Sequence, residues 1–150
     1  MLEVEQPTLI RLRERLLTPF GLKIVESADE VAGATDLGPY IPGVFLMAAW
    51  SEVVDDPNGG DFQIEKEYWQ TSVLVAYQQI KDQAEPKQIV DTAAQRASAI
   101  LKATAGALVG WRPAKGYLTF AYRGRPDPIY QPGYGEFPAL FETGLIITGT

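Results

Sequence analysis

The longest patterned stretch of the chain runs from Phe62 to Ile80 and contains neither Gly nor Pro. In its second half Val73, Val75 and Tyr77 alternate with small or apolar residues, as in a half-buried strand. The first half, from Gln63 to Glu67, is mostly polar. At ~3.3 Å per residue the stretch would be roughly 60 Å long, about twice the ~30 Å width of a small domain. We therefore predict a long strand with its second half in the core and its first half projecting.

A second apolar stretch, from Val44 to Val54, precedes the long one and is apolar on both faces, which predicts a strand covered on both sides. Turn-forming residues lie between the two stretches, in the sequence DDPNGGD, and predict a two-stranded antiparallel hairpin. The acids of this connection, Asp55, Asp56 and Asp61, lack the ligand spacing of a calcium loop. A solvated hairpin tip or a contact surface is the better interpretation. In the first of the two strands, strict alternation predicts that one face carries Val44, Leu46, Ala48 and Trp50.

Two amphipathic helices are predicted, one on each side of the hairpin in sequence. The first runs from about Pro7 to Leu17 with a stripe of leucines, and the second from about Pro86 to Thr104 with a stripe of alanine and isoleucine. Gly106 is the expected end of the second helix. The segment from Arg123 to Pro138 is too rich in Pro and Gly for long regular structure. The shorter predicted elements are a strand over Leu22 to Val25, a helix over Ala28 to Ala34, and strands over Tyr117 to Tyr122, Ile129 to Gln131 and Phe141 to Thr148.

Length and composition fit one folded domain spanning residues 1–150. The chain has 150 residues, 46% of them hydrophobic and 11% aromatic, which is enough for a substantial core. Its net charge of −6 argues against general binding to nucleic acid or to anionic membranes. No apolar stretch approaches the ~18 residues of a membrane-spanning helix. The acidic N-terminal sequence MLEVEQP is unlike a signal peptide, so we expect the protein to fold in a cytosol.

The chain contains neither cysteine nor histidine. This excludes thiol nucleophiles, disulfides, Cys/His zinc sites and Ser-His-Asp hydrolysis. No phosphate-binding glycine loop is present. Glu65 and Glu67 share one strand face, but Lys66 lies between them on a polar segment, so a solvated arm is favoured over paired catalytic carboxylates. We therefore predict no enzyme activity, no metal site and no cofactor.

Opposite charges concentrate in two separate parts of the chain. Acids gather between Glu52 and Glu67, and bases interleaved with aromatic residues gather between Arg112 and Arg125. Aromatic and basic residues together can bind single-stranded nucleic acid, but an acidic chain favours a charge-complementary contact between subunits. Salt bridges within one subunit remain an alternative. The candidate interface residues are Asp55, Asp56, Asp61, Glu65, Glu67, Trp111, Arg112, Tyr122, Arg123 and Arg125.

The order of these elements resembles a known family. LLTPFGLKIV ends the first helix, PGVFLMAAW opens the first long strand, and EKEYWQTSVLVAY lies in the second. A segment with Gly110, Trp111 and Pro113 follows the second helix. Over nearly its whole length the chain resembles the tail terminator, or tail completion, proteins of long-tailed bacteriophages.

The resemblance and the predicted elements together imply an α/β fold of the α+β type. Its mixed, largely antiparallel sheet would carry a long projecting β-hairpin and be flanked by an N-terminal helix and one major helix. The resemblance also implies a structural virion protein, made in the host cytoplasm, that forms a hexameric ring at the head–tail junction. Such a ring caps the tail tube, ends its polymerisation and docks the head connector. The implied partners are further copies of the chain, the tail tube protein and the head–tail connector protein, with no membrane and no specific nucleic acid.

Three alternatives stay open at this point. One is a head–tail connector or head-completion protein, which also forms rings. The others belong to different classes of protein: a small carboxylate-dependent enzyme and a small ligand-binding domain. An enzyme should show a pocket with a polar cluster of perturbed pKa values, and an assembly protein should not.

Overall fold

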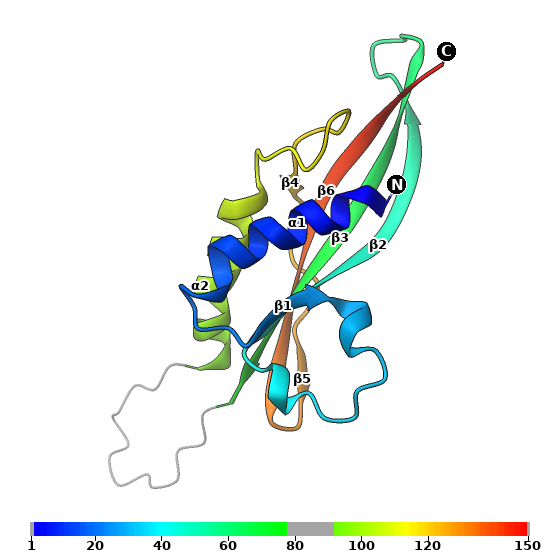
Figure 1. Cartoon of the computed structure of the whole chain (residues 1–150). Helices are drawn as coiled ribbons and strands as arrows, with labels where there is room; N and C mark the ends of the chain where they lie inside the picture. Colours follow the sequence, from blue (N-terminus) through cyan, green and yellow to red (C-terminus); the bar gives the residue numbers. More distant parts are fainter. Residues whose placement is uncertain (1, 78–91, 150) are drawn as a thin grey trace, which may run out of the picture.

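The computed structural model describes residues 2–77 and 92–149. Its centre is a sheet of long, twisted strands, with the principal helices packed across one face (Figure 1). The helical elements are η1 (Leu2–Val4), α1 (Glu5–Leu12), the π-helical turn η2 (Arg13–Leu17), η3 (Ala28–Val31), η4 (Gly38–Tyr40) and α2 (Ala93–Leu108). The strands are β1 (Ile24–Ser27), β2 (Gly43–Asp55), β3 (Phe62–Ala76), β4 (Ala121–Tyr122), β5 (Ile129–Gln131) and β6 (Tyr134–Thr148).

The six strands form one mixed sheet in the order β1-β2-β3-β6-β4, with β5 also pairing with β6. Only the β1–β2 pair is parallel, and the other pairs are antiparallel. This architecture confirms the predicted α+β fold with an N-terminal helix and one further helix. Among the described residues, no helix has the length and apolarity needed to cross a membrane.

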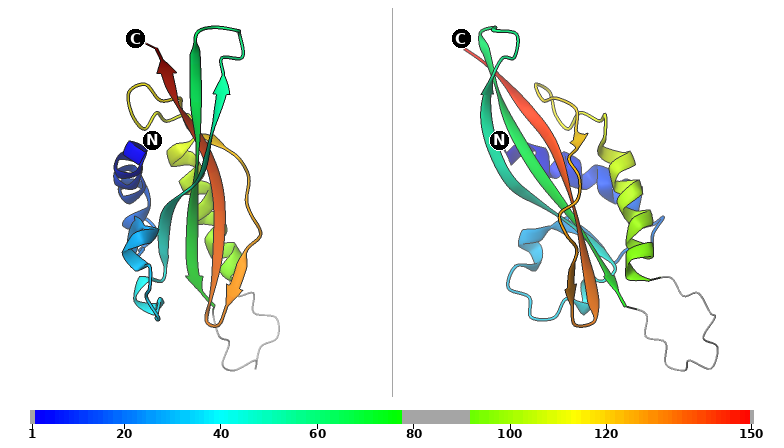
Figure 2. Two further views of the ribbon diagram at one scale, coloured as in Figure 1. Left: turned by 90° about the vertical axis from the view of Figure 1, so that its right-hand side faces the viewer. Right: turned by 180° about the vertical axis from the view of Figure 1, so that it is seen from behind.

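The predicted hairpin is confirmed, because β2 and β3 pair from Gly43↔Leu74 to Asp55↔Gln63. The prediction of a two-stranded arm is wrong. β6 pairs with β3 over its whole length, from Ala76↔Tyr134 to Phe62↔Thr148, and Figure 2 shows the end of β6 beside the hairpin tip. The projecting arm therefore has three strands, a number that can hold together without a partner.

The prediction that both faces of the first long strand are covered is also wrong. Its side chains are buried from Val44 to Leu46 and exposed from Met47 onward, apart from a half-buried Val54. A β-bulge between Ala48 and Trp50 shifts the register. Because the bulge inserts one residue, Trp50 pairs with Tyr68 on the face away from the helices, opposite to the face that simple alternation gives.

The main core lies between the sheet and α1, η2 and α2. Leu9, Leu12 and Leu16 of the first helical unit pack with the helix-side residues of β3 and β6, including Val73 and Phe141. Ala97 and Ile100 do the same from α2. A smaller core lies on the opposite face under η3 and η4 and contains Ile41, Phe45 and Leu74. Beyond these two clusters, none of the helices in the described part of the chain covers the outer face of the sheet toward the hairpin tip (Figure 2).

Several predicted boundaries change. The second helix begins at the N-cap Thr92, whose hydroxyl accepts a hydrogen bond from the Gln95 N–H in a capping box. The predicted start at Pro86 lies outside the described residues. The helix also continues past Gly106 to Leu108, so Gly106 is not its end. Tyr77, expected in the core, is exposed and stacks on Tyr130 at a ring-centroid distance of 6.4 Å.

The last strand is longer than predicted because it tolerates Pro138 in its interior. Leu140 bonds through both its N–H and its C=O to the segment at Arg123 and Gly124. Pro138, two residues earlier, therefore points its nitrogen toward the same side of β6. That position falls between β5 and β4, where neither strand pairs with β6. Since no ladder bond is needed there, the missing N–H of Pro138 costs little.

Candidate assembly surface

The hairpin tip exposes only part of its predicted acidic cluster. Asp56 is 9% exposed, because its carboxylate turns inward and accepts a 2.9 Å hydrogen bond from the Asn58 N–H. A side chain on Gly60 would lie only 1.9 Å from the same carboxylate. Asp56 is therefore a turn-forming residue, and the prediction that it is exposed for a contact is wrong. Asp55 and Asp61 are exposed as predicted.

Glu67 also departs from the predicted solvated arm. It is 4% exposed and interacts with the hydroxyl of Tyr117, which reaches β6 from the loop after α2. Burial raises the pKa of Tyr117 well above its usual range, and a hydrogen bond to Glu3 and the charge of Glu67 add to the shift. A long-range contact therefore holds Glu67 in place, and strand spacing alone does not reveal it. Glu65 stays half-buried on the same face.

The basic segment divides into exposed and internally paired residues. Arg112 and Arg125 are exposed. Arg123 donates two hydrogen bonds to Glu142 of β6, with Nε to Oε1 at 3.2 Å and Nη2 to Oε2 at 3.4 Å. Arg123 thus forms a salt bridge within the subunit, which is the alternative to a contact between subunits. Of the three predicted interface arginines, Arg112 and Arg125 are therefore the two best placed to meet another molecule.

Sequence reasoning missed the polar cluster that Arg123 joins on the outer face of the sheet. The hydroxyl of Tyr68 donates to Glu52 Oε1 at 3.1 Å and lies within hydrogen-bonding reach of Glu142. Burial and these two carboxylates raise the pKa of Tyr68 to about 12. Burial pushes the pKa of Glu142 upward, but the hydrogen bonds from Arg123 and Tyr68 outweigh it and lower that pKa. The cluster ties β2, β3 and β6 together across the arm.

The two aromatic residues of the predicted interface differ in exposure. Trp111 is half-buried, stacks on Phe120 at 6.2 Å between ring centroids, and has the guanidinium carbon of Arg11 4.9 Å from its own centroid. Tyr122 is more exposed and packs against Phe141 at 5.5 Å. Tyr122 lines a hollow together with Arg125, so a cation lies beside apolar surface there, whereas Trp111 lies against α1.

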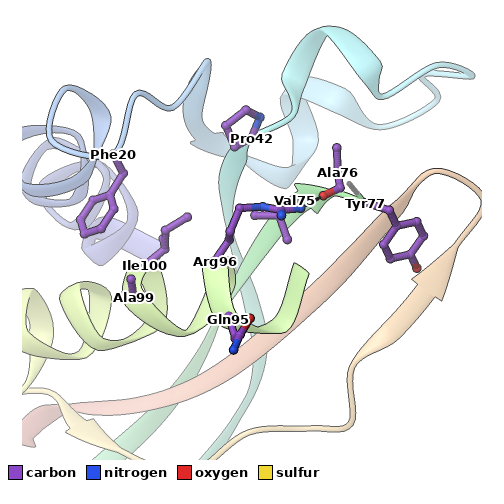
Figure 3. A pocket seen from close by; sticks show the side chains of 9 residues that line it. All are labelled: Phe20, Pro42, Val75, Ala76, Tyr77, Gln95, Arg96, Ala99 and Ile100. Atoms are coloured by element: carbon purple, nitrogen blue, oxygen red, sulfur yellow. Dashed lines mark hydrogen bonds between the residues drawn. The ribbon is translucent and has the colours of Figure 1, made fainter. Parts of the chain in front are cut away.

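An apolar pocket of about 510 Å³ lies between the end of β3 and the first turns of α2 (Figure 3). Among the lining residues that the structure describes, Arg96 is the one that carries a charge, and its guanidinium donates to the carbonyl of Ala76. None of the lining residues in the described part of the chain is a carboxylate. No group of three potential metal ligands occurs in residues 2–77 and 92–149. The pocket is lined by Phe20, Pro42, Val75, Ala76, Tyr77, Gln95, Arg96, Ala99 and Ile100.

Comparison with known proteins decides the class. A family model described as phage tail terminator protein matches residues 5–150. The chain belongs to the phage tail terminator protein family. Among solved structures, a chain in the virion of a native gene transfer agent particle has a similar fold, with a TM-score of 0.58 and 16% sequence identity. The alignment covers 97% of this chain and 95% of that chain. No curated protein matches the sequence.

As a member of the tail terminator family, the chain is a structural protein of the phage tail and a component of the virion. This confirms the family that the sequence motifs indicated. The family is not a class of enzymes. The surfaces to be explained are therefore those through which a virion protein meets its neighbours.

Proposed function

We propose that the chain forms a homo-oligomeric ring, a hexamer, that caps the last ring of the tail tube at the head–tail junction. The ring ends tube polymerisation and offers its other face to the head connector. The observation that carries this proposal is the family match over residues 5–150. The same match favours a terminator over a head–tail connector or head-completion protein.

The proposed contact between subunits joins the arm of one copy to the basic segment of the next, between Arg112 and Arg125. Asp55 and Asp61 at the hairpin tip, with Glu65 on the arm, would approach Arg112 and Arg125 of a neighbour. Arginine suits this role because its planar guanidinium can hold a carboxylate through two hydrogen bonds. Opposite charges on different parts of one chain favour a head-to-tail contact, which closes into a ring when the rotation allows.

The affinity would come mainly from apolar contacts near the charges. An exposed ion pair contributes only ~0.2–1 kcal/mol, so the charged pairs would chiefly set register and exclude wrong orientations. The apolar surface beside the cations comes from Trp111 and Tyr122, which are half-buried and exposed respectively.

Native mass spectrometry of the purified protein tests the ring. We expect one discrete closed oligomer, a hexamer, with no higher species as the protein concentration rises. A heterologous contact that closes leaves no free surface for growth. A monomer at every concentration, or an open-ended series of oligomers, would contradict the proposal.

A further inference from the structure

One edge of the sheet is left open on the arm. β1 pairs only with residues Gly43 to Leu46 of β2. From residue 47 to residue 55 no other described strand pairs with the outer side of β2. A long open edge presents unpaired backbone groups to any extended chain that approaches it.

The direction of the backbone groups on this edge follows from the sheet register. In an antiparallel strand, the N–H and C=O of one residue point to the same side, and those of the next residue point to the other. The N–H and C=O of Leu140 form their hydrogen bonds on the side of β6 away from β3, so the N–H and C=O of Phe141 point toward β3. The N–H and C=O of Trp69, the register partner of Phe141, then point toward β6. Those of Tyr68 point toward β2, where Tyr68 pairs with Trp50.

The alternation continues along β2 beyond Trp50. Ser51, Val53 and Asp55 therefore point their N–H and C=O groups toward the open side. In the part of the chain that the structure describes, none of these backbone groups makes a hydrogen bond to another element. Three residues spaced two apart, each offering a donor and an acceptor, form the hydrogen-bonding pattern that a further strand uses.

The β1 edge is blocked. Arg13 donates from its Nε to the carbonyl of Val25 at 2.9 Å, and its guanidinium also pairs with Glu26 at 2.7 Å. A side chain thus occupies the backbone acceptor that an added strand would need.

The edge beyond β6 is blocked in two ways. Phe120 exchanges backbone hydrogen bonds with Gly110 and Trp111, so its outer side is already paired. Between β4 and β5 the edge segment carries Pro126 and Pro128, which have no N–H to donate. Of the described edges, the stretch of β2 from 47 to 55 thus stays open along the greatest length.

The surroundings of the open edge are apolar with acids nearby. Trp50 is 51% exposed and Val53 58% exposed. On the helix side a groove of about 350 Å³ runs along residues 48–51 and is lined also by Leu2 and Trp69. The indole Nε1 of Trp69 is buried and has no hydrogen-bond partner in residues 2–77 and 92–149. Glu52 lies on the outer face of the arm and Glu65 on the helix side, next to the edge.

We propose that residues 47–55 of β2 bind an extended segment of another virion protein by strand addition. Main-chain bonds to Ser51, Val53 and Asp55 supply the pairing, and the groove takes one apolar side chain of the segment. Glu52, which is exposed on the edge strand itself, selects lysine or arginine at a neighbouring position. The inference rests on the proposed function only in requiring a virion partner, and it does not depend on the ring contact.

A second copy of the chain does not fit as the occupant. The other described edges of the copy are blocked at β1 and at β4, and β5 offers only the three residues Ile129–Gln131. Antiparallel pairing of β2 with β2 about Val53, the centre of the outward-facing residues, would set Glu52 of one copy diagonally across the seam from Glu52 of the other, and repulsion between like charges disfavours such a strand pair. The segment therefore comes from a chain of different, basic and apolar composition.

The test uses the full chain and two variants at one residue. Val53→Pro removes one outward N–H without touching the β3 ladder, and Val53→Thr is the matched control that keeps the N–H. The probe is a short synthetic peptide with blocked ends in which valine alternates with lysine or threonine. Its binding is followed by fluorescence anisotropy, and circular dichroism verifies that each variant is folded.

We expect the peptide to bind the natural chain and Val53→Thr alike and Val53→Pro about tenfold or more weakly. A peptide with glutamate in place of lysine should not bind. Equal binding to both variants would overturn strand addition, because the attraction would then be purely electrostatic. Absence of binding to the natural chain would overturn it too. Sedimentation of the variants without peptide gives the remaining outcome: if Val53→Pro alone changes the oligomer, a second copy occupies the edge and the proposed partner is wrong.

Discussion

Reversing two charges together, Arg112→Glu with Arg125→Glu, is expected to abolish the oligomer and leave a folded monomer. Both residues are exposed, so the fold should tolerate the change. At the proposed contact, however, each reversal replaces attraction to Asp55, Asp61 or Glu65 with repulsion. The effect is large because the same contact recurs at every subunit boundary of a ring. Native mass spectrometry and circular dichroism measure assembly and folding separately.

Two controls separate the proposed contact from net charge and from stability. Arg15→Glu with Lys23→Glu changes the net charge equally at exposed positions away from the proposed contact, and should leave the oligomer intact. Arg123→Glu should instead destabilise the fold, because Arg123 is bound to Glu142 within the subunit. Adding Asp55→Arg and Asp61→Arg to the double variant should restore part of the assembly. An oligomer that survives the Arg112 and Arg125 reversals would rule out the proposed contact.

The second large effect is expected from Phe141→Ala, in the core under the arm. Phe141 is fully buried in β6, is the register partner of Trp69 and packs against Tyr122. Removing the ring leaves a cavity among rigid strands and should cost about 3–5 kcal/mol of unfolding free energy. That is a large part of the 5–15 kcal/mol typical of a whole domain.

Urea unfolding followed by circular dichroism measures this loss. The control is Tyr130→Ala, which removes a ring from the exposed edge strand β5 and should cost far less. If both variants lost equal stability, the contacts assigned to the helix side of β6 would be wrong.

The sequence predicted the hairpin well because its signals are local. A run without Gly or Pro on each side of DDPNGGD leaves few alternatives to two paired strands, and β2 and β3 meet there as expected. The short strand at Ile129 to Gln131 was likewise predicted with its observed bounds. In each case, the residues that determine the structure are neighbours in the chain.

The errors arise where distant residues decide the outcome. Strict alternation assigned Trp50 to the wrong face because a bulge is not visible in a pattern of period two. The pattern of its own strand predicts a solvated Glu67, because the contact with Tyr117 comes from a distant part of the chain. The burial of Asp56, by contrast, follows a local rule. The side chain of an aspartate in a turn commonly accepts a hydrogen bond from the backbone N–H two residues later, as Asp56 does from Asn58, so the sequence alone contains this signal.

The same reasoning explains why the extent of the last strand was underestimated. The abundance of Pro and Gly between Arg123 and Pro138 predicted irregular structure, yet β6 begins at Tyr134. Whether a proline breaks a strand depends on which side its nitrogen faces, and only the sheet order supplies that information.

Electron microscopy of purified tail tubes, with and without the protein, tests the central claim most directly. If the chain is a ring that caps the tube, density for it should appear at one end of each tube and nowhere along the shaft. Adding it to polymerising tube subunits should shorten the tubes, since a capped end cannot grow. Protein bound along the tube wall, or tubes that grow equally long with bare ends in its presence, would contradict the account.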